Sequence, residues 1–316
     1  MLLVFGYAVA LAWCAPVPLR RLTARGISPR LGLAAWLTAM FSALASAATA
    51  LALLISAAVT GWSGLAEAVC RSVAGNSCAP AVYRSAFFEL ALGAAAVAAA
   101  LTAAVLMWRY GRKVQRAQRQ TRTHGQAARI AGHELPGAGG AVVLDAREPA
   151  AYCVPGRPAT IVVTRGALAV LDRAQLTAVL AHERAHLAGR HHLLIALTRA
   201  LTACFPAVPL FTQGPAEVAR LAEMCADDAA ARRTTRPTLI AALLAMGTGI
   251  AVPATALAAT GGATVARVQR LMEPPRRGCH ARYGLALAAA VVLLVVVSGG
   301  LTVFAGPLAA HGIAAA

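Results

Sequence analysis

The sequence has few charged residues and almost no lysine, although it is strongly basic. Only 13% of its 316 residues are charged, 59% are hydrophobic and 5% are aromatic. An average soluble domain has about a quarter of its residues charged and about half apolar. Lys113 is the only lysine, so arginine carries nearly all of the formal net charge of +17. This composition excludes an ordinary soluble enzyme with one large core and indicates several bilayer spans beside a smaller polar region.

The positive charge is not distributed as in a nucleic-acid-binding protein. Arginines cluster at the ends of apolar segments, first at positions 20–30 and then at positions 109–122. The sequence has no DNA-reading motif and no basic face interleaved with aromatic residues. Clusters of this kind orient membrane helices, because they stay on the cytoplasmic side. We therefore expect the lipid bilayer as a partner and no direct contact with nucleic acid.

Four apolar segments reach the length of about 20 residues that a helix needs to cross a bilayer. They are Leu2–Leu19, Leu31–Thr60, Ala86–Trp108 and Leu285–Ala305. The first lacks the basic start of a signal peptide and has its arginines behind it, so we expect it to remain as a span. The charge rule then places residues 109–282 in the cytoplasm of a bacterial cell.

The predicted organisation is three transmembrane helices in residues 1–108, a cytoplasmic domain in residues 109–282, and a last transmembrane helix with a short external tail in residues 283–316. Two further apolar segments, Leu193–Phe211 and Thr238–Ala259, are interrupted by arginine, proline or glycine. We expect both to be helices of the cytoplasmic domain that pack on each other or against the membrane face. Whether they enter the membrane stays open.

Local patterns within residues 109–282 predict a basic helix and then a small sheet. The basic stretch Arg109–Arg129 either contacts anionic lipid headgroups or is a solvated orientation signal. The β-rich runs Ala141–Leu144 and Thr160–Thr164 predict strands, with helices after them.

The cysteines are divided between the two compartments. Cys70 and Cys78 share the predicted external loop, where both a disulfide and two free thiols are compatible with the sequence. The cytoplasmic cysteines, which form no C-x-x-C pair, are expected to be reduced. They are Cys153, Cys204, Cys225 and Cys279.

One motif points to metal chemistry. A capping box at Asp172–Gln175 predicts the start of a helix that continues into His182-Glu183-Arg184-Ala185-His186. Residues four apart share one face of a helix, so both imidazoles can bind one ion. This is the H-E-x-x-H arrangement of zinc peptidases. It predicts Zn²⁺ as cofactor, His182 and His186 as ligands, and Glu183 as the general base that deprotonates the attacking water.

A catalytic zinc usually has three protein ligands, and Glu223 is the leading candidate for the third. Glu223 and Asp227 lie four residues apart in a second predicted helix, where Asp227 can orient a zinc-bound imidazole. Taken alone, this segment also fits a solvated acidic patch. A site that joins His186 to Glu223 requires that no single membrane crossing lies between them.

Other polar residues near these motifs have less specific roles. His191 and His192 are expected to cap or pack rather than to bind the ion. Cys225 is expected to be structural, because adjacent helical positions diverge in direction. Arg157, Arg165 and His280 are candidates for stabilising an oxyanion, and the sequence does not choose among them.

These residues resemble the gluzincin membrane peptidases, in particular the BlaR/MecR-type family, with HtpX-like and CAAX prenyl proteases as relatives. The match runs from about residue 151 to residue 228 and includes Ala151–Gly156, Ile161–Gly166 and the E-x-x-x-D pair. Arg184 and Ala226 depart from the common BlaR/MecR pattern. We also expect no penicillin-binding sensor domain, because only about eleven residues follow the last span.

The resemblance implies His182, His186 and Glu223 as zinc ligands, Glu183 as base and Asp227 as the partner of a ligand. It also implies that the Thr160–Thr164 strand lines the cleft and pairs with an extended substrate. The predicted fold is thus a mainly α membrane protein with about four transmembrane helices and a small α+β gluzincin-like domain.

Three functions are compatible with this prediction. The first is a zinc metalloendopeptidase that cleaves a protein or peptide substrate in signalling, by analogy a winged-helix transcriptional repressor. The second is an HtpX-like quality-control protease with the same chemistry. The third is a membrane sensor or scaffold without catalytic activity, in which the zinc site is structural.

Overall fold

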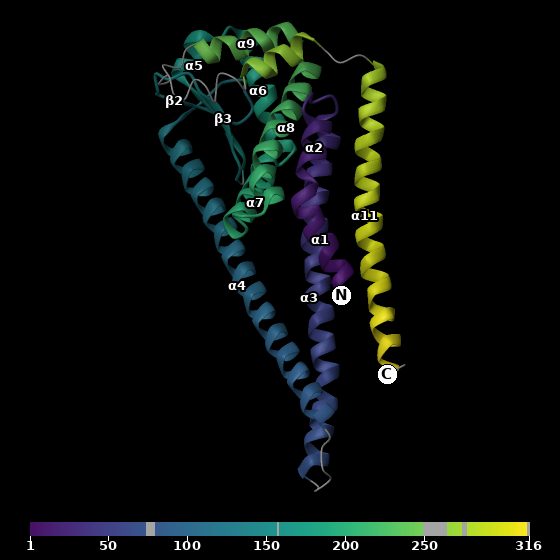
Figure 1. Ribbon diagram of the computed structural model, residues 1–316. Coiled ribbons are helices and arrows are strands. Elements are labelled where there is room, and N and C mark those ends of the chain that lie inside the picture. The colour runs from purple at the N-terminus through teal and green to yellow at the C-terminus, as the bar shows by residue number, and fades with distance from the viewer. Residues whose placement is uncertain (74–79, 157, 249–263, 274–276, 315–316) are drawn as a thin grey trace.

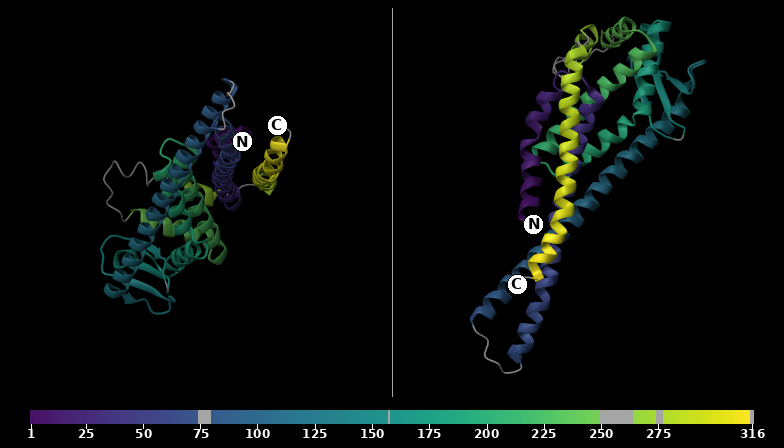
Figure 2. Two further views of the ribbon diagram at one scale, coloured as in Figure 1. Left: turned by 90° about the horizontal axis from the view of Figure 1, so that it is seen from below. Right: turned by 90° about the vertical axis from the view of Figure 1, so that its right-hand side faces the viewer.

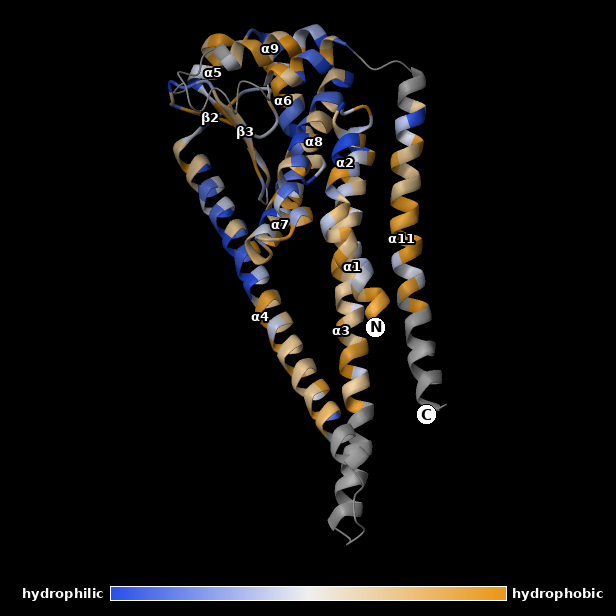
Figure 3. Cartoon of the chain, viewed as in Figure 1, coloured by the Kyte–Doolittle hydropathy of each residue, from blue (hydrophilic) through white to orange (hydrophobic). Residues whose placement is uncertain are grey.

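The protein is mainly helical, with a small sheet near one end of a bundle of long helices. The computed structural model describes residues 1–73, 80–156, 158–248, 264–273 and 277–314 (Figure 1). Long apolar helices occupy one part of the molecule, and the sheet with its surrounding shorter helices occupies the other (Figure 3). The predicted fold class, a mainly α membrane protein with a small α+β domain, is confirmed.

In the part of the chain that the structure describes, three helices are long and apolar enough to cross a bilayer. These spans are Pro29–Val59 in α3 (Pro29–Val73), Phe87–Ala131 in α4 (Pro80–Ala131) and Ala281–Leu301 in α11 (Arg277–Ala314). The first predicted span is divided into α1 (Leu2–Cys14) and α2 (Pro16–Thr23), which are bent by 45°. Proline at position 16 accounts for the bend, since it lacks an N–H and clashes with the preceding turn. Counting this pair as one span gives the predicted four.

Helix α4 runs without a break from the apolar span into the polar part of the molecule. Its surface changes from hydrophobic to hydrophilic along its length (Figure 3). Figures 1 and 2 show α4 diverging from α3 as it approaches the sheet. The predicted basic helix is therefore the second half of α4, and the boundary at residue 108 stays a prediction.

The sheet has four strands in the order β1-β2-β4-β3. Strands β2 (Ala141–Leu144) and β4 (Thr160–Thr164) have the predicted bounds, whereas β1 (His133–Glu134) and β3 (Ala151–Val154) were not predicted as strands. Because β4 pairs with β2 in parallel and with β3 in antiparallel orientation, both of its edges are occupied. The expectation that β4 pairs with substrate is therefore wrong. Strand β3 lies at the edge of the sheet.

Several shorter helices of the described residues follow the sheet before α11. They are α5 (Arg165–Val170), α6 (Arg173–Ala188), α7 (His191–Cys204), α8 (Pro209–Arg233) and α9 (Arg236–Thr248), and residues 264–272 are also helical. The segment predicted as one helix over residues 193–211 is a helix, a turn and the start of α8. Helix α7 packs against α4 and α8, and α9 packs against α6. The rest of the predicted second helix lies outside the described residues.

The α7–α8 hairpin joins the polar part of the molecule to the spans. Its side chains Leu210, Phe211 and Leu221 are buried in one core cluster with Trp36 and Met40 of α3. The thiol of Cys204, at the end of α7, lies 3.8 Å from the backbone oxygen of Leu106 in the apolar half of α4. Since α7 has only 14 residues, the chain turns back here instead of crossing a bilayer.

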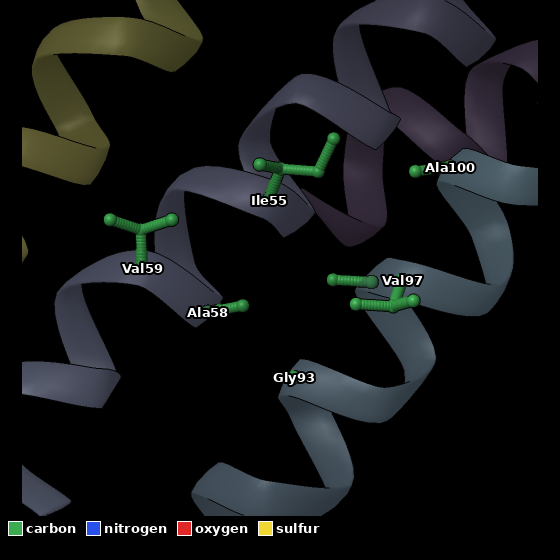
Figure 4. A pocket seen from close by; sticks show the side chains of 7 residues that line it. Ile55, Ala58, Val59, Gly93, Val97 and Ala100 are labelled. Carbon is green, nitrogen blue, oxygen red and sulfur yellow. The ribbon is translucent and has the colours of Figure 1, made fainter.

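An apolar cavity of about 380 Å³ lies between α3 and α4, among the membrane spans (Figure 4). Its lining contains no charged side chain, so we do not assign the chemistry to it. The lining residues are Ile55, Ala58, Val59, Gly93, Ala96, Val97 and Ala100.

The cysteine predictions are tested only in part. Cys14, Cys153, Cys204 and Cys225 are free thiols. Cys78 of the predicted external pair lies outside the described residues, as do the side chains of Cys70 and Cys279.

Candidate metal centre

Helix α6 carries two histidines on one buried face. The predicted capping box is present, with the Gln175 N–H donating to Asp172 Oδ1 over 2.8 Å and the Asp172 N–H donating to Gln175 Oε1 over 3.0 Å. Capping satisfies N–H groups that the first turn leaves without helical partners. Three turns further on, the Nε2 atoms of His182 and His186 lie 3.1 Å apart. The helix thus presents two imidazole nitrogens to one point.

Helix α8 brings a carboxylate to the same point. The Oε2 atom of Glu223 lies 3.4 Å from His182 Nε2, and its Oε1 atom lies 3.4 Å from His186 Nε2. One ligand atom from each of the three residues lies within 4.8 Å of the others. Two imidazoles and one carboxylate are a ligand set of catalytic zinc sites, in which a fourth position takes water. The residues therefore fit a metal ion.

Asp227 lies behind the first histidine, one turn of α8 beyond Glu223. Its Oδ1 atom is 3.1 Å from His182 Nδ1, and the residue is only 1% exposed. A carboxylate in this place fixes the ring so that Nε2 faces the ion. The structure thus places Asp227 where the sequence prediction requires it.

Arg267 is a site residue that the sequence analysis missed. Its Nη2 and Nε donate to Asp227 Oδ1 and Oδ2 over 2.6 and 2.8 Å. Its Nη1 lies 3.1 Å from Glu223 Oε2. The guanidinium therefore compensates the charge of the buried Asp227 and of the partly buried Glu223. The sequence contains one signal for such a residue, the basic cluster Arg267, Arg270, Arg276, Arg277 and Arg282.

His191 lies against the second histidine. Its Nδ1 is 3.0 Å from Nδ1 of His186, and the two rings are perpendicular. Burial, with the neighbouring His186, lowers the pKa of His191 to about 4. A neutral His191 can therefore accept the Nδ1 proton of His186, which leaves His186 Nε2 free for the ion. His191 therefore packs against the candidate ligand His186, and this is consistent with the packing role expected for it.

Glu183 is buried beside the three candidate ligands. Burial raises its pKa, although the two histidines oppose the shift. The Cys153 thiol of β3 is close enough to this carboxylate to feel its charge. Burial, followed by the Glu183 charge, raises the pKa of Cys153 to about 12. A neutral thiol can donate to Glu183 without adding charge. A carboxylate with a raised pKa is a better proton acceptor than an exposed one.

The protonation of His182 predicts how metal affinity depends on pH. Burial by itself would lower its pKa, but the carboxylates of Asp227 and Glu223 outweigh burial and raise it to about 9. The pKa of Glu223 is shifted downward instead. Burial alone would raise it, but the two histidines and Arg267 lower it far below the usual range.

We therefore expect zinc to displace a proton from His182 at neutral pH. Zinc affinity should rise by about tenfold per pH unit as the pH approaches 9, and level off above that value, because only the neutral imidazole binds metal. Chelator competition on the purified protein at several pH values measures this slope. A flat profile between about pH 6 and 9 would contradict it.

The remaining sequence candidates do not join the site or fall outside the described residues. Arg165 is exposed and lies 3.3 Å from Asp145. Arg157 and the side chain of His280 are outside the described residues. Cys225 is buried in α8 and does not belong to the group that can hold a metal, as expected.

The sequence comparison agrees with this geometry. Residues 113–274, just over half of the chain, match the family model of Peptidase family M48. The match contains the sheet, α6, α8 and Arg267. No curated protein and no solved structure matches the chain.

Proposed function

The chain belongs to peptidase family M48 and is a membrane-associated metallopeptidase; from this premise, we propose that it is a zinc endopeptidase that cuts a protein substrate at the cytoplasmic face of a bacterial membrane. One observation carries the proposal. The two imidazoles of α6 and the Glu223 carboxylate of α8 converge on one point. A second carboxylate, that of Glu183, is buried beside them.

Zinc is the metal that the ligand set favours. Nitrogen and carboxylate ligands in a group of three, with no cysteine among them, are typical of catalytic rather than structural zinc sites. His182, His186 and Glu223 would hold the ion. When bound there, it supplies a Lewis acid that polarises a water molecule and the scissile carbonyl.

The protein side chains would then handle the protons. Glu183 accepts a proton from the attacking water and later passes it to the leaving amine nitrogen, so the carboxylate is regenerated in each cycle. The Asp227 carboxylate lies 3.1 Å from His182 Nδ1, where it favours the tautomer with the proton on Nδ1 and so leaves Nε2 for the ion. Arg267 balances the charge of the two carboxylates of α8.

The distribution of charge supports a cytoplasmic site. Helix α8 contacts the backbone of Thr23, which follows Arg20 and Arg21 and precedes Arg25. Among the α4 side chains that the structure describes, the exposed arginines lie in the half of the helix next to the sheet. Clusters of arginine at this end of the spans favour the cytoplasmic side.

Strand β3, rather than β4, is the candidate for substrate pairing. The Thr164 N–H donates to the Ala150 carbonyl over 2.9 Å, and hydrogen-bonded pairs alternate along an antiparallel ladder. By this alternation, the N–H and carbonyl groups of Ala151 and Cys153 face the outer edge, where no other strand of the described residues pairs. Since the Cys153 side chain is beside Glu183, an extended peptide on this edge would run past the candidate base.

Replacing Ala151 with proline tests this edge. Proline removes an outward-facing N–H, and the first position of a strand tolerates it. We expect KM for an extended peptide to rise about tenfold, the value of one lost hydrogen bond, while kcat changes little. Ala151→Gly, which keeps the N–H, is the matched control. Equal KM values for the two variants would exclude pairing at this position.

A regulatory protein, such as a winged-helix repressor, is the substrate class that the BlaR/MecR resemblance favours. The test of the function is to incubate the purified, zinc-loaded protein with proteome-derived peptides and then with candidate proteins, before and after chelation. Zinc-restored cleavage supports the peptidase. A single cut in one partner favours signalling, and a broad pattern favours quality control. Stoichiometric zinc without any cleavage would support a structural site instead.

A further inference from the structure

The loop between α2 and α3 is tied to the metal centre by arginine side chains. The Nη2 of Arg220 on α8 donates to the Thr23 carbonyl over 2.9 Å, and its Nη1 lies 3.4 Å from the carbonyl of Ala24. The Nε of Arg270 donates to the carbonyl of Gly26 over 2.9 Å. Three backbone oxygens, one at the end of α2 and two in the loop, are therefore bound by side chains from the polar part of the molecule.

Arg270 also binds α8 directly. Its Nη1 and Nη2 form a bidentate pair with Asp228, and both N···O distances are 2.9 Å. Arg270 lies three residues after Arg267, so both belong to one turn of the helix of residues 264–272. One arginine of this turn therefore contacts Asp227 and Glu223, and the other contacts Asp228 and the loop.

The loop itself is shaped to fit this contact. Gly26 has φ of +56°, a conformation that favours glycine. A Cβ atom at this position would collide with Sδ of Met224 and lie 3.1 Å from Nε of Arg270. Met224 is adjacent to Glu223 in α8. The backbone at Gly26 is thus in direct contact with both elements that position the α8 carboxylates.

We propose that Arg270 is a positioning residue for the metal centre, and that it couples the α2–α3 loop to the geometry of Glu223 and Asp227. A displacement of the loop, which connects two membrane-embedded segments, would shift the Arg267 guanidinium and the carboxylates that it holds. This inference rests on the proposed metal site. It adds a route by which the membrane part can change metal binding and turnover.

The sign of the effect of Arg270→Gln separates positioning from simple electrostatics. Removing a positive charge near a cation site would by itself strengthen metal binding. Loss of positioning weakens it, and changes to groups that orient ligands typically reduce metal affinity by about 10- to 100-fold. We therefore expect the zinc dissociation constant to rise about tenfold in the full-length protein, measured by chelator competition well below its melting temperature.

Gly26→Ala tests the same contact without any change of charge. We expect it to weaken zinc binding in the same direction, and to add little further loss in the Arg270→Gln background, because both changes act through one contact. The matched control for Arg270→Gln is Arg233→Gln, at the exposed end of α8. The matched control for Gly26→Ala is Gly111→Ala, because a Cβ there would meet open space. Both controls should bind zinc as the wild type does.

The proposal would be overturned if Arg270→Gln melted near the wild-type temperature and bound zinc as tightly as the wild type or more tightly. It would also be overturned if the losses of zinc affinity in the two single variants simply added in the double variant. Restoration of affinity by Arg270→Lys to a value between wild type and Arg270→Gln would support it. A wild-type protein that binds zinc and cleaves nothing would refute the peptidase function, while these affinity comparisons would keep their meaning.

Discussion

Replacing Glu183 with glutamine should reduce kcat for peptide cleavage by about 10²- to 10⁴-fold, the usual contribution of a general base. The amide has nearly the shape of the carboxylate but cannot accept the proton of the attacking water. Since Glu183 is not among the three candidate ligands, zinc should remain bound in stoichiometric amount. Turnover and metal content measured on the same preparation check both parts of this expectation.

The matched control for this experiment is Glu134→Gln. Glu134 is exposed on β1, and it does not belong to the group of residues that can hold a metal. We expect this variant to keep most of its activity. A Glu183→Gln protein that retains zinc and cleaves at the wild-type rate would remove the base assignment.

Replacing Arg267 with glutamine should have the largest effect on stability. Asp227 is almost fully buried and depends on this guanidinium for two hydrogen bonds. Removing one partner of a buried ion pair leaves an uncompensated charge and typically costs about 3–5 kcal/mol. We expect a correspondingly lower melting temperature for the metal-free protein in detergent.

The size of this loss should depend on pH. Below about pH 9, protonated His182 can still pair with Asp227, because the folded-state pKa of His182 is raised to about 9. Above that value the imidazole is neutral and the full penalty appears. The Asp227→Asn, Arg267→Gln double variant removes both charges and should melt above the Arg267→Gln single variant. We compare the loss of melting temperature in Arg267→Gln, relative to the wild type, at about pH 8 and about pH 10. An equal loss at the two pH values would contradict a role of protonated His182 in pairing with Asp227.

Elements specified by neighbouring residues could be predicted from the sequence. The capping box, the start of α6 and the strands β2 and β4 depend on patterns within a few positions, and all occur where they were expected. The spacing of His182 and His186 likewise predicted that their rings would meet. The proximity of Glu223 was expected because a catalytic zinc needs a third ligand, rather than from any local pattern.

Features specified by long-range contacts could not be predicted in this way. The pairing of Asp227 with Arg267 joins residues 40 positions apart, and no periodic pattern connects them. The order of the sheet was also missed, since an apolar run such as Thr160–Thr164 has the same composition at the centre of a sheet as near its edge. Because β4 lies inside the sheet and β3 at its edge, β3 replaces β4 as the candidate strand for substrate pairing.

The α7–α8 hairpin implies that the peptidase cannot be separated from its anchor by truncation. A fragment of residues 109–273 would carry Leu210, Phe211, Val218 and Leu221 without the α3 surface that buries them in the whole chain. Exposed apolar patches of this kind lead to aggregation. Biochemical work on a fragment without α3 would therefore describe an aggregation-prone particle, and catalysis is better studied on a chain that retains α3.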